Sequence, residues 1–305
     1  MSVRDRVDAF APAGVDIDEE TLTGVGLVLP AIALIAAVLV YPFIGAIRLS
    51  FLNIDTGAFV GLDHYRWLLT QENFWSFTVK TLVWTVGNLA LQGFFGVTVA
   101  MALNRQFPGR DGLRTAILLP FVIPTAVTGI LWRWMFNGSW GPINVLLQQE
   151  LGLISTPFTP FVNEQFTLAA VTFVNAWRWV PLVALIVFAV LQTIPREQYE
   201  AARIEGAGLW SEFYHVTYPH LSSALSVLGL LGFLITFNIF DMIWLLTNGG
   251  PGTATTTLPV FVYEVAFKRQ AIARGNAISV VLLLMLIVFV VAFFWRNQVL
   301  EEGSA

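Results

Sequence analysis

Long runs of apolar residues, separated by short polar stretches, set the pattern of this chain. A helix needs about 20 mostly apolar residues to cross the hydrocarbon core of a bilayer. The stretches that meet this length predict six spans, near 24–51, 77–103, 113–136, 167–192, 222–247 and 275–296. None of them alternates apolar and polar residues at period two, which favours helices over the strands of a membrane barrel. The pattern therefore predicts an all-α polytopic membrane protein.

The composition agrees with this interpretation and excludes several kinds of chemistry. Only 12% of the 305 residues are charged, against about 25% in a soluble domain. The net charge of −4 comes with no basic stripe, so we expect no nucleic-acid partner. Cysteine is absent and the histidines are scattered, so we expect no disulfide and no metal site.

The charged residues of the short loops predict how the chain is oriented. We expect an acidic tail over 1–23, a transmembrane domain over 24–296 and a second tail over 297–305. The turn 104–114 carries three arginines, whereas 137–166 carries neither arginine nor lysine. Because positively charged loops stay in the cytoplasm, we expect both tails there. The polar loop between the fourth and fifth spans, 193–221, is then cytoplasmic as well.

That loop contains the stretch 199–219, YEAARIEGAGLWSEFYHVTYP. Its first part favours a helix, which Gly206 and Gly208 interrupt because glycine adopts backbone conformations that other residues avoid. We expect a second helix over 209–218, closed by Pro219. The pattern fits an ordinary folded loop or a docking element for a partner. The charged residues expected on its surface are Glu200, Arg203, Glu205 and Glu212.

The motifs of this loop and of other segments resemble those of a known family. EAARIEGA, followed by VTYP, resembles the EAA signature of permease subunits of prokaryotic ABC importers. GLDHY at 61–65, RTAILLPFVIP at 114–124 and TNGGPGTATTT at 247–257 are similar to segments of the sugar-permease branch, the maltose and glycerol-3-phosphate type. Glu205 and Lys80 depart from that pattern, because aspartate and asparagine are more usual there.

The resemblance implies the type I ABC importer permease fold, in a prokaryotic cell membrane, with a coupling helix between spans four and five. The implied partners are a second homologous permease subunit, a dimer of ATPase subunits and an extracytoplasmic solute-binding protein. The chain has no Gly-Lys pair and hence no P-loop. We therefore expect no catalytic residue and no cofactor on this chain, with ATP and Mg²⁺ bound by the ATPase. The residues that the resemblance assigns to ATPase coupling are Glu200, Ala201, Ala202, Glu205, Gly206 and Ala207.

Polar residues within the apolar runs are candidates for the substrate path. Asp241 lies inside the expected fifth span, where a charge is costly and usually faces a cavity or a partner. It could instead pair with Arg178 or Arg133, and an asparagine could bind a sugar hydroxyl or another helix. The candidates for the path are Asp241, Asn238, Arg178 and Asn175. The segment containing Gly249, Gly250 and Pro251 is expected outside, against the binding protein or over the cavity.

The function indicated is that of a permease subunit of an ATP-driven, binding-protein-dependent carbohydrate importer, forming half of the translocation pathway. The alternatives are a stand-alone secondary transporter driven by an ion gradient and a membrane scaffold. Secondary carriers often contain internal repeats, and no convincing repeat occurs here. The few charges within the spans do not converge as a phosphorylated ligand would need, which favours neutral sugars. The sugar itself is left open.

Overall fold

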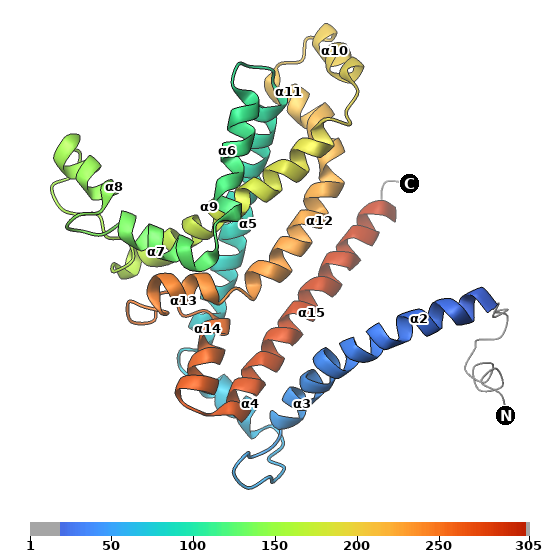
Figure 1. The fold of residues 1–305 in the computed structure, drawn as a ribbon, viewed down its shortest axis with the longest axis vertical. Helices are drawn as coiled ribbons and strands as arrows, with labels where there is room; N and C mark the ends of the chain where they lie inside the picture. Colours follow the sequence, from blue (N-terminus) through green and yellow to red (C-terminus); the bar gives the residue numbers. More distant parts are fainter. Residues whose placement is uncertain (1–18, 303–305) are drawn as a thin grey trace.

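The computed structural model describes residues 19–302, and their side chains over 24–296. Helices make up most of this range, and the longest of them form a bundle (Figure 1). The elements in chain order are α2 (Glu19–Ile35), the π-helical η1 (Ala36–Val40), α3 (Tyr41–Leu49), α4 (Asp63–Thr70), α5 (Phe74–Asn104), α6 (Arg110–Val122), α7 (Thr125–Met135), α8 (Pro142–Asn144), η2 (Val145–Glu150), α9 (Glu164–Leu191), α10 (Arg196–Ile204), α11 (Leu209–Glu212), η3 (Phe213–Thr217), α12 (Tyr218–Phe237), α13 (Asp241–Thr247), α14 (Leu258–Tyr263), η4 (Glu264–Lys268) and α15 (Ile272–Glu302).

Five continuous helices in the described range are long and apolar enough to cross a membrane. They correspond to five of the six expected spans and confirm the all-α polytopic fold. The sixth, expected over 113–136, is broken, because α6 and α7 meet at an angle of 100°. Pro124 has no N–H to continue the helix, and Ile123 before it is extended, with ψ of 127°. The bent pair counts as one span only when both halves are taken together.

The fifth span also differs from the expected helix over 222–247. At its N-terminal end, the helix does not stop at Pro219 but continues through the π-helical η3 into α12. At its other end, α12 stops at Phe237, and Asp241 begins the separate helix α13. The indole Nε1 of Trp84 donates to the carbonyl of Thr236 at 3.0 Å, so this helix end has a partner inside the protein. Asp241 therefore lies at a break between two helices and not within one continuous helix.

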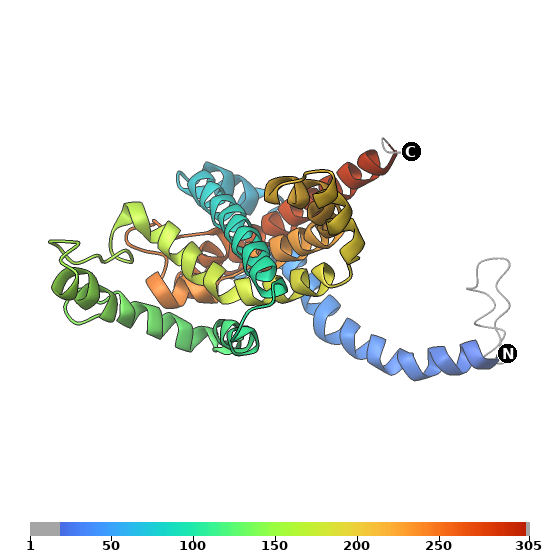
Figure 2. The ribbon, with the colours of Figure 1, turned by 90° about the horizontal axis from the view of Figure 1, so that it is seen from above.

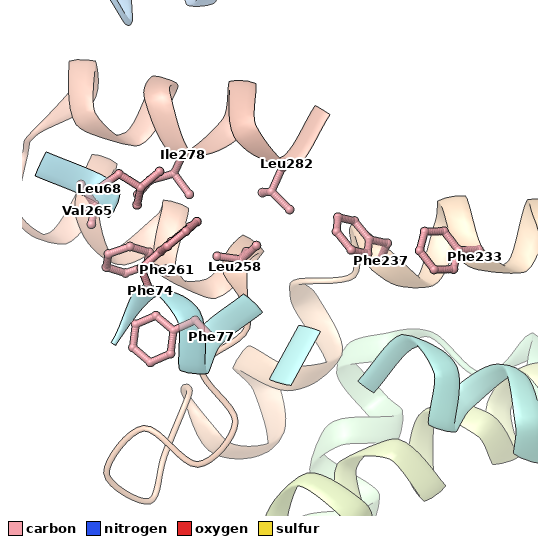
Figure 3. Packing of buried hydrophobic residues seen from close by; sticks show 10 residues of the cluster. All are labelled: Leu68, Phe74, Phe77, Phe233, Phe237, Leu258, Phe261, Val265, Ile278 and Leu282. Atoms are coloured by element: carbon pink, nitrogen blue, oxygen red, sulfur yellow. The ribbon is translucent and has the colours of Figure 1, made fainter. Parts of the chain in front are cut away.

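A cluster of buried apolar side chains joins the end of the chain to its middle (Figure 3). It holds α15 against α4, α12 and α14, and one end of α5 takes part. Such contacts are needed because lipid supplies no hydrophobic force that would drive the helices together. The members are Leu68, Phe74, Phe77, Phe233, Phe237, Leu258, Phe261, Val265, Ile278 and Leu282.

The first helix stands apart from this bundle (Figures 1 and 2). It begins at Glu19, five residues before the expected start of the span, and residues 1–18 of the predicted acidic tail lie outside the described range. Within its most apolar window, none of the residues of Gly24–Leu49 is buried. Only α3, at its far end, packs against α15. The arm thus offers a long apolar surface that the rest of the described chain leaves uncovered.

Candidate functional site

The helix α10 and the short helix α11 form a hairpin at one end of the bundle (Figure 1). Tyr199 and Ala202, on the inner side of α10, pack on a buried cluster formed by α5, α9 and α12. The hydroxyl groups of Tyr199 and Thr217 lie 3.1 Å apart and join α10 to the end of η3, which follows α11 and leads into α12. The hairpin is therefore packed against the ends of α5, α9 and α12.

Gly206 makes the corner of the hairpin. Its φ of +84° is left-handed, a conformation that costs other residues strain. The N–H of Gly206 donates to the carbonyl of Arg203 at 3.0 Å, and that of Ala207 donates to the carbonyl of Ala202 at 2.9 Å. These two bonds form a Schellman motif, which satisfies the carbonyls at the end of a helix. The corner predicted from the two glycines is thus present, and Gly206 carries it.

An ion pair closes the hairpin behind this corner. The Nε of Arg203 lies 2.7 Å from Oε1 of Glu212, and its NH2 group donates to Oε2 at 3.3 Å. The bidentate hydrogen bond to this carboxylate raises the pKa of Arg203 above its ordinary value. Glu212 was expected on the surface together with Arg203, but its side chain is only 12% exposed. The pair fixes the angle between α10 and α11.

The outer face of the hairpin is apolar, with acidic residues beside it. Ile204 is 88% exposed, Trp210 77% and Leu209 69%. Glu200 and Glu205 are also exposed. Leu209 and Trp210 were not among the candidates from the sequence. The signal was a pair of large apolar residues directly after a glycine corner in a polar loop, where solvent exposure is unfavourable unless a partner covers them.

Two of the four candidate path residues meet at the break between α12 and α13. Asn238 is exposed and ends α12, and Asp241 is exposed at the first position of α13. Negative charge is favourable at a helix N-terminus. Asp241 belongs to neither ion pair found within residues 24–296, so the expected pairing with Arg178 or Arg133 is absent there.

A row of aromatic rings lies beside this break. The ring centroid of Tyr263 is 4.8 Å from that of Phe240 and 4.7 Å from that of Trp244. Phe267 continues the row at 5.5 Å from Tyr263. The Nζ of Lys268 lies 4.3 Å from the centroid of Trp244. Aromatic faces next to an amide and a carboxylate are suited to a ligand with both apolar faces and hydroxyl groups.

The other two candidate path residues lie on α9 and bind groups of the protein. Asn175 is buried, and its amide donates to Oδ1 of Asn88 on α5 at 2.7 Å. Arg178 is half-buried, and its Nε donates to the carbonyl of Ile123 at 3.4 Å. That carbonyl belongs to the break between α6 and α7, where the helical bonds are interrupted. The sequence did not suggest either partner.

The loop between α13 and α14 is held from both sides. Gly249 has a φ of +89°, and its carbonyl accepts a bond from Oγ1 of Thr256 at 3.0 Å. The Nζ of Lys80, at the start of α5, donates to the carbonyl of Thr253 at 2.6 Å. Gly249 is buried and Gly250 and Pro251 are half-buried, so the loop is ordered around the three residues singled out in the sequence. The residues that the structure describes contain no group of three or more potential metal ligands.

Comparison with known proteins agrees with this architecture. The model of the family described as "Binding-protein-dependent transport system inner membrane component" matches residues 92–303. The trehalose/maltose transport system permease protein MalF of Thermococcus litoralis is 29% identical over 282 residues, which are 90% of this chain and 93% of the relative. The sulfoquinovosyl glycerol transport system permease protein SmoG of Agrobacterium fabrum is 30% identical and covers 86% of both chains.

The fold also has a counterpart among solved structures. A bacterial ABC transporter involved in the import of the acidic polysaccharide alginate superposes with a TM-score of 0.81. The superposition covers 92% of this chain and 96% of the other, at 20% sequence identity. The similarity extends over nearly the whole length of both chains, so the broken third span and the hairpin lie within the part of this chain whose fold the two proteins share.

Proposed function

Because this chain belongs to the family of binding-protein-dependent transport system inner membrane components, we propose that it is a carbohydrate permease subunit that a separate ATPase drives. The hairpin made by α10 and α11 is the contact with that ATPase, and the chain forms half of the translocation pathway. The chain itself carries no catalytic residue and binds no cofactor. ATP and Mg²⁺ are bound by the partner.

The exposed apolar face of an otherwise fixed hairpin carries this proposal. Ile204 and Trp210 would be unfavourable in water and become favourable when a cleft in a partner covers them. Glu200 lies on the exposed side of α10, and Ala201 leaves room for close approach. The Arg203–Glu212 pair makes the hairpin rigid, and Tyr199 and Ala202 pack it on the bundle, so force on its outer face passes to α9 and α12. The residues proposed to take part in coupling are Glu200, Ala201, Ala202, Glu205, Gly206 and Ala207, of which Ala202 packs on the cluster under the hairpin.

We propose that the sugar passes the break between α12 and α13. Asn238 and Asp241 supply hydrogen-bonding groups there, and the neighbouring aromatic row supplies faces for a sugar ring. Asn175 and Arg178 support the path by holding α9 to α5 and to the broken third span. Gly249, Gly250 and Pro251 belong to the loop that contacts the solute-binding protein or caps the cavity. The carbohydrate class follows from the sugar permeases among the relatives.

The proposed orientation places both termini in the cytoplasm. The hairpin must face the cytoplasm to reach an ATPase, and the turn between α5 and α6 lies at the same end of the bundle, because Leu103 and Ile117 share the cluster under the hairpin. When the bent pair counts as one span, four spans precede the hairpin and two follow it. Both numbers are even, so both ends of the chain lie on the same side of the membrane as the hairpin. The uncovered α2–α3 arm is proposed to pack on the second permease subunit.

The test is to purify the tagged chain from its native membranes and to identify the copurifying subunits. The complex is then reconstituted with ATP and the binding protein, and uptake is measured across a panel of neutral mono-, di- and oligosaccharides. Glu200→Lys should lower ATP-dependent uptake by about tenfold or more, since reversing a charge in a buried interface costs several kcal/mol. Glu72→Lys, an exposed site away from the hairpin, is the control. Uptake that requires no second protein would support the secondary transporter instead.

A further inference from the structure

A groove between α5, α6 and α9 leads to two arginines that share one aromatic ring. The groove is a cavity of about 460 Å³, and its lining is almost wholly apolar. The residues along it are Leu91, Phe95 and Val99 of α5, Ala116, Ile117 and Pro120 of α6, and Phe173, Ala176, Trp177, Val180 and Pro181 of α9. We propose that this groove binds an anionic phospholipid, with an acyl chain in the cavity and the phosphate on Arg110 and Arg114.

The arginines lie on the same side of α6 as the groove. Arg110, Arg114, Ile117 and Pro120 follow one another at spacings of three and four residues, which places them on one face of a helix. On α9, Phe173, Val180 and Phe188 lie along a similar stripe that leads to the same end. From Phe173 to Phe188 the helix rises by roughly 22 Å. That length is enough for one leaflet of a core that is about 30 Å thick.

The two positive charges lie against one aromatic ring, and neither has an anionic partner in an ion pair among residues 24–296. The guanidinium carbons of Arg110 and Arg114 each lie 5.3 Å from the centroid of Phe188. Neither arginine belongs to the ion pairs found within residues 24–296. Asp111, the acidic residue of this turn, is exposed and does not belong to either ion pair. Two like charges one helical turn apart repel, and an anion between them removes that repulsion.

A phosphodiester headgroup fits this arrangement. Arginine binds phosphate oxygens with two N–H groups in a plane, and basic pockets between spans on the cytoplasmic side are typical sites for anionic headgroups. Arg105 adds a third positive charge in the same turn. The site favours a lipid over free phosphate, because only a lipid places an acyl chain in the groove and a phosphate on the arginines. This inference depends on the spans crossing the membrane and not on which solute is carried.

Native mass spectrometry of the purified protein, with the subunits that copurify, tests the proposal. After delipidation the protein is incubated with equal amounts of phosphatidylglycerol and phosphatidylcholine carrying the same acyl chains. The wild type should retain phosphatidylglycerol with a preference of roughly tenfold, since each basic residue near an anionic headgroup adds to the affinity. The R110Q/R114Q variant should lose that preference. R66Q/R274Q removes the same charge at other sites, of which Arg274 also lies on a ring, 4.7 Å from the centroid of Trp67, and should keep it.

A third variant separates the groove from the arginines. Ala116 lines the cavity and is exposed, so Ala116→Phe fills the groove without overpacking the protein. It should lower the count of bound phosphatidylglycerol although both arginines remain. The proposal is overturned if the wild type shows no preference, if R110Q/R114Q keeps the preference, or if Ala116→Phe has no effect. It is overturned equally if R110Q/R114Q releases a protein subunit while the lipid counts stay unchanged, since the groove would then be a subunit contact.

Discussion

Gly206 shows how the backbone of a single residue determines the direction of the hairpin. A Cβ at this position would meet no atom within 4 Å apart from the residue itself and its two chain neighbours, so the surroundings leave room for a side chain. The backbone conformation requires a glycine instead, because at a φ of +84° a Cβ lies too close to the adjacent backbone carbonyl. The two glycines of the corner therefore have different roles, because Gly208 has a φ of −81° that any residue adopts.

Gly206→Ala should destabilise the hairpin by about 1–2 kcal/mol, since it places an alanine in the left-handed region. Gly208→Ala should change stability by much less, because it has both the room and an ordinary backbone conformation. Thermal unfolding of the two purified variants, measured side by side, checks this. Equal stability of the two variants would mean that the corner does not depend on the left-handed residue.

Asn88 and Asn175 should behave as a coupled pair. Each is at most 1% exposed, and the amide of one donates to the oxygen of the other. Interhelical hydrogen bonds in membranes contribute about 0.6 kcal/mol on average and up to about 1.7 kcal/mol. A double-mutant cycle of Asn88→Ala and Asn175→Ala, followed by thermal unfolding, should give a coupling energy in that range. Strictly additive losses would contradict the contact.

At this scale the sequence identified the residue types but not all of their partners. Asn175 was compatible with a sugar hydroxyl or a neighbouring helix, and the choice depends on which face of α9 meets α5. Glu212 was expected in solvent, since nothing in its own segment indicates that the corner turns Arg203 back onto it. The glycine corner itself was predictable, because the left-handed preference of glycine is a local property.

At the scale of elements, two of the spans expected from hydropathy, 113–136 and 222–247, each contain two helices in the structure. The bend of 100° after α6 has a local cause in Pro124, and α7 beyond it packs against α13, which is far away in the sequence. The break after Phe237 has no proline at all. The buried carbonyl of Thr236 at this helix end accepts a bond from Trp84, which is 152 residues away in the sequence. Because the residues on both sides of this break are apolar, hydropathy predicted one continuous span over 222–247 in place of α12 and α13.

The loop between α13 and α14 provides the test at this scale. Lys80 and Thr256 hold it in place, and it joins the broken span to α14. Deleting 249–256 should abolish sugar uptake and leave assembly with the ATPase intact, because the loop lies away from the hairpin. Uptake and copurification of the ATPase are measured on the same preparation. Wild-type uptake by the deletion variant would show that the loop neither contacts the binding protein nor caps the cavity.

At the scale of the whole molecule, the chain is one subunit of a larger assembly. Its bundle is held together by contacts around α5 and α9, whereas no other part of the described chain covers the α2–α3 arm and the outer face of the hairpin. Composition and hydropathy predicted the membrane fold, because both follow from the solvent around the chain. Surfaces that bind a partner subunit were harder to predict from the sequence, since an apolar residue in a membrane protein can equally face lipid.

The most direct measurement uses the absence of native cysteine. A single cysteine in place of Ile204, at the exposed tip of α10, is cross-linked within the native membrane, and the adduct is identified. A cysteine in place of Ile54, which is exposed between α3 and α4, is the control. The account predicts that position 204 reacts from the cytoplasmic side and cross-links to an ATPase subunit, whereas position 54 does neither. Labelling of position 204 only from outside the cell, or a hairpin that cross-links to no ATPase, would contradict it.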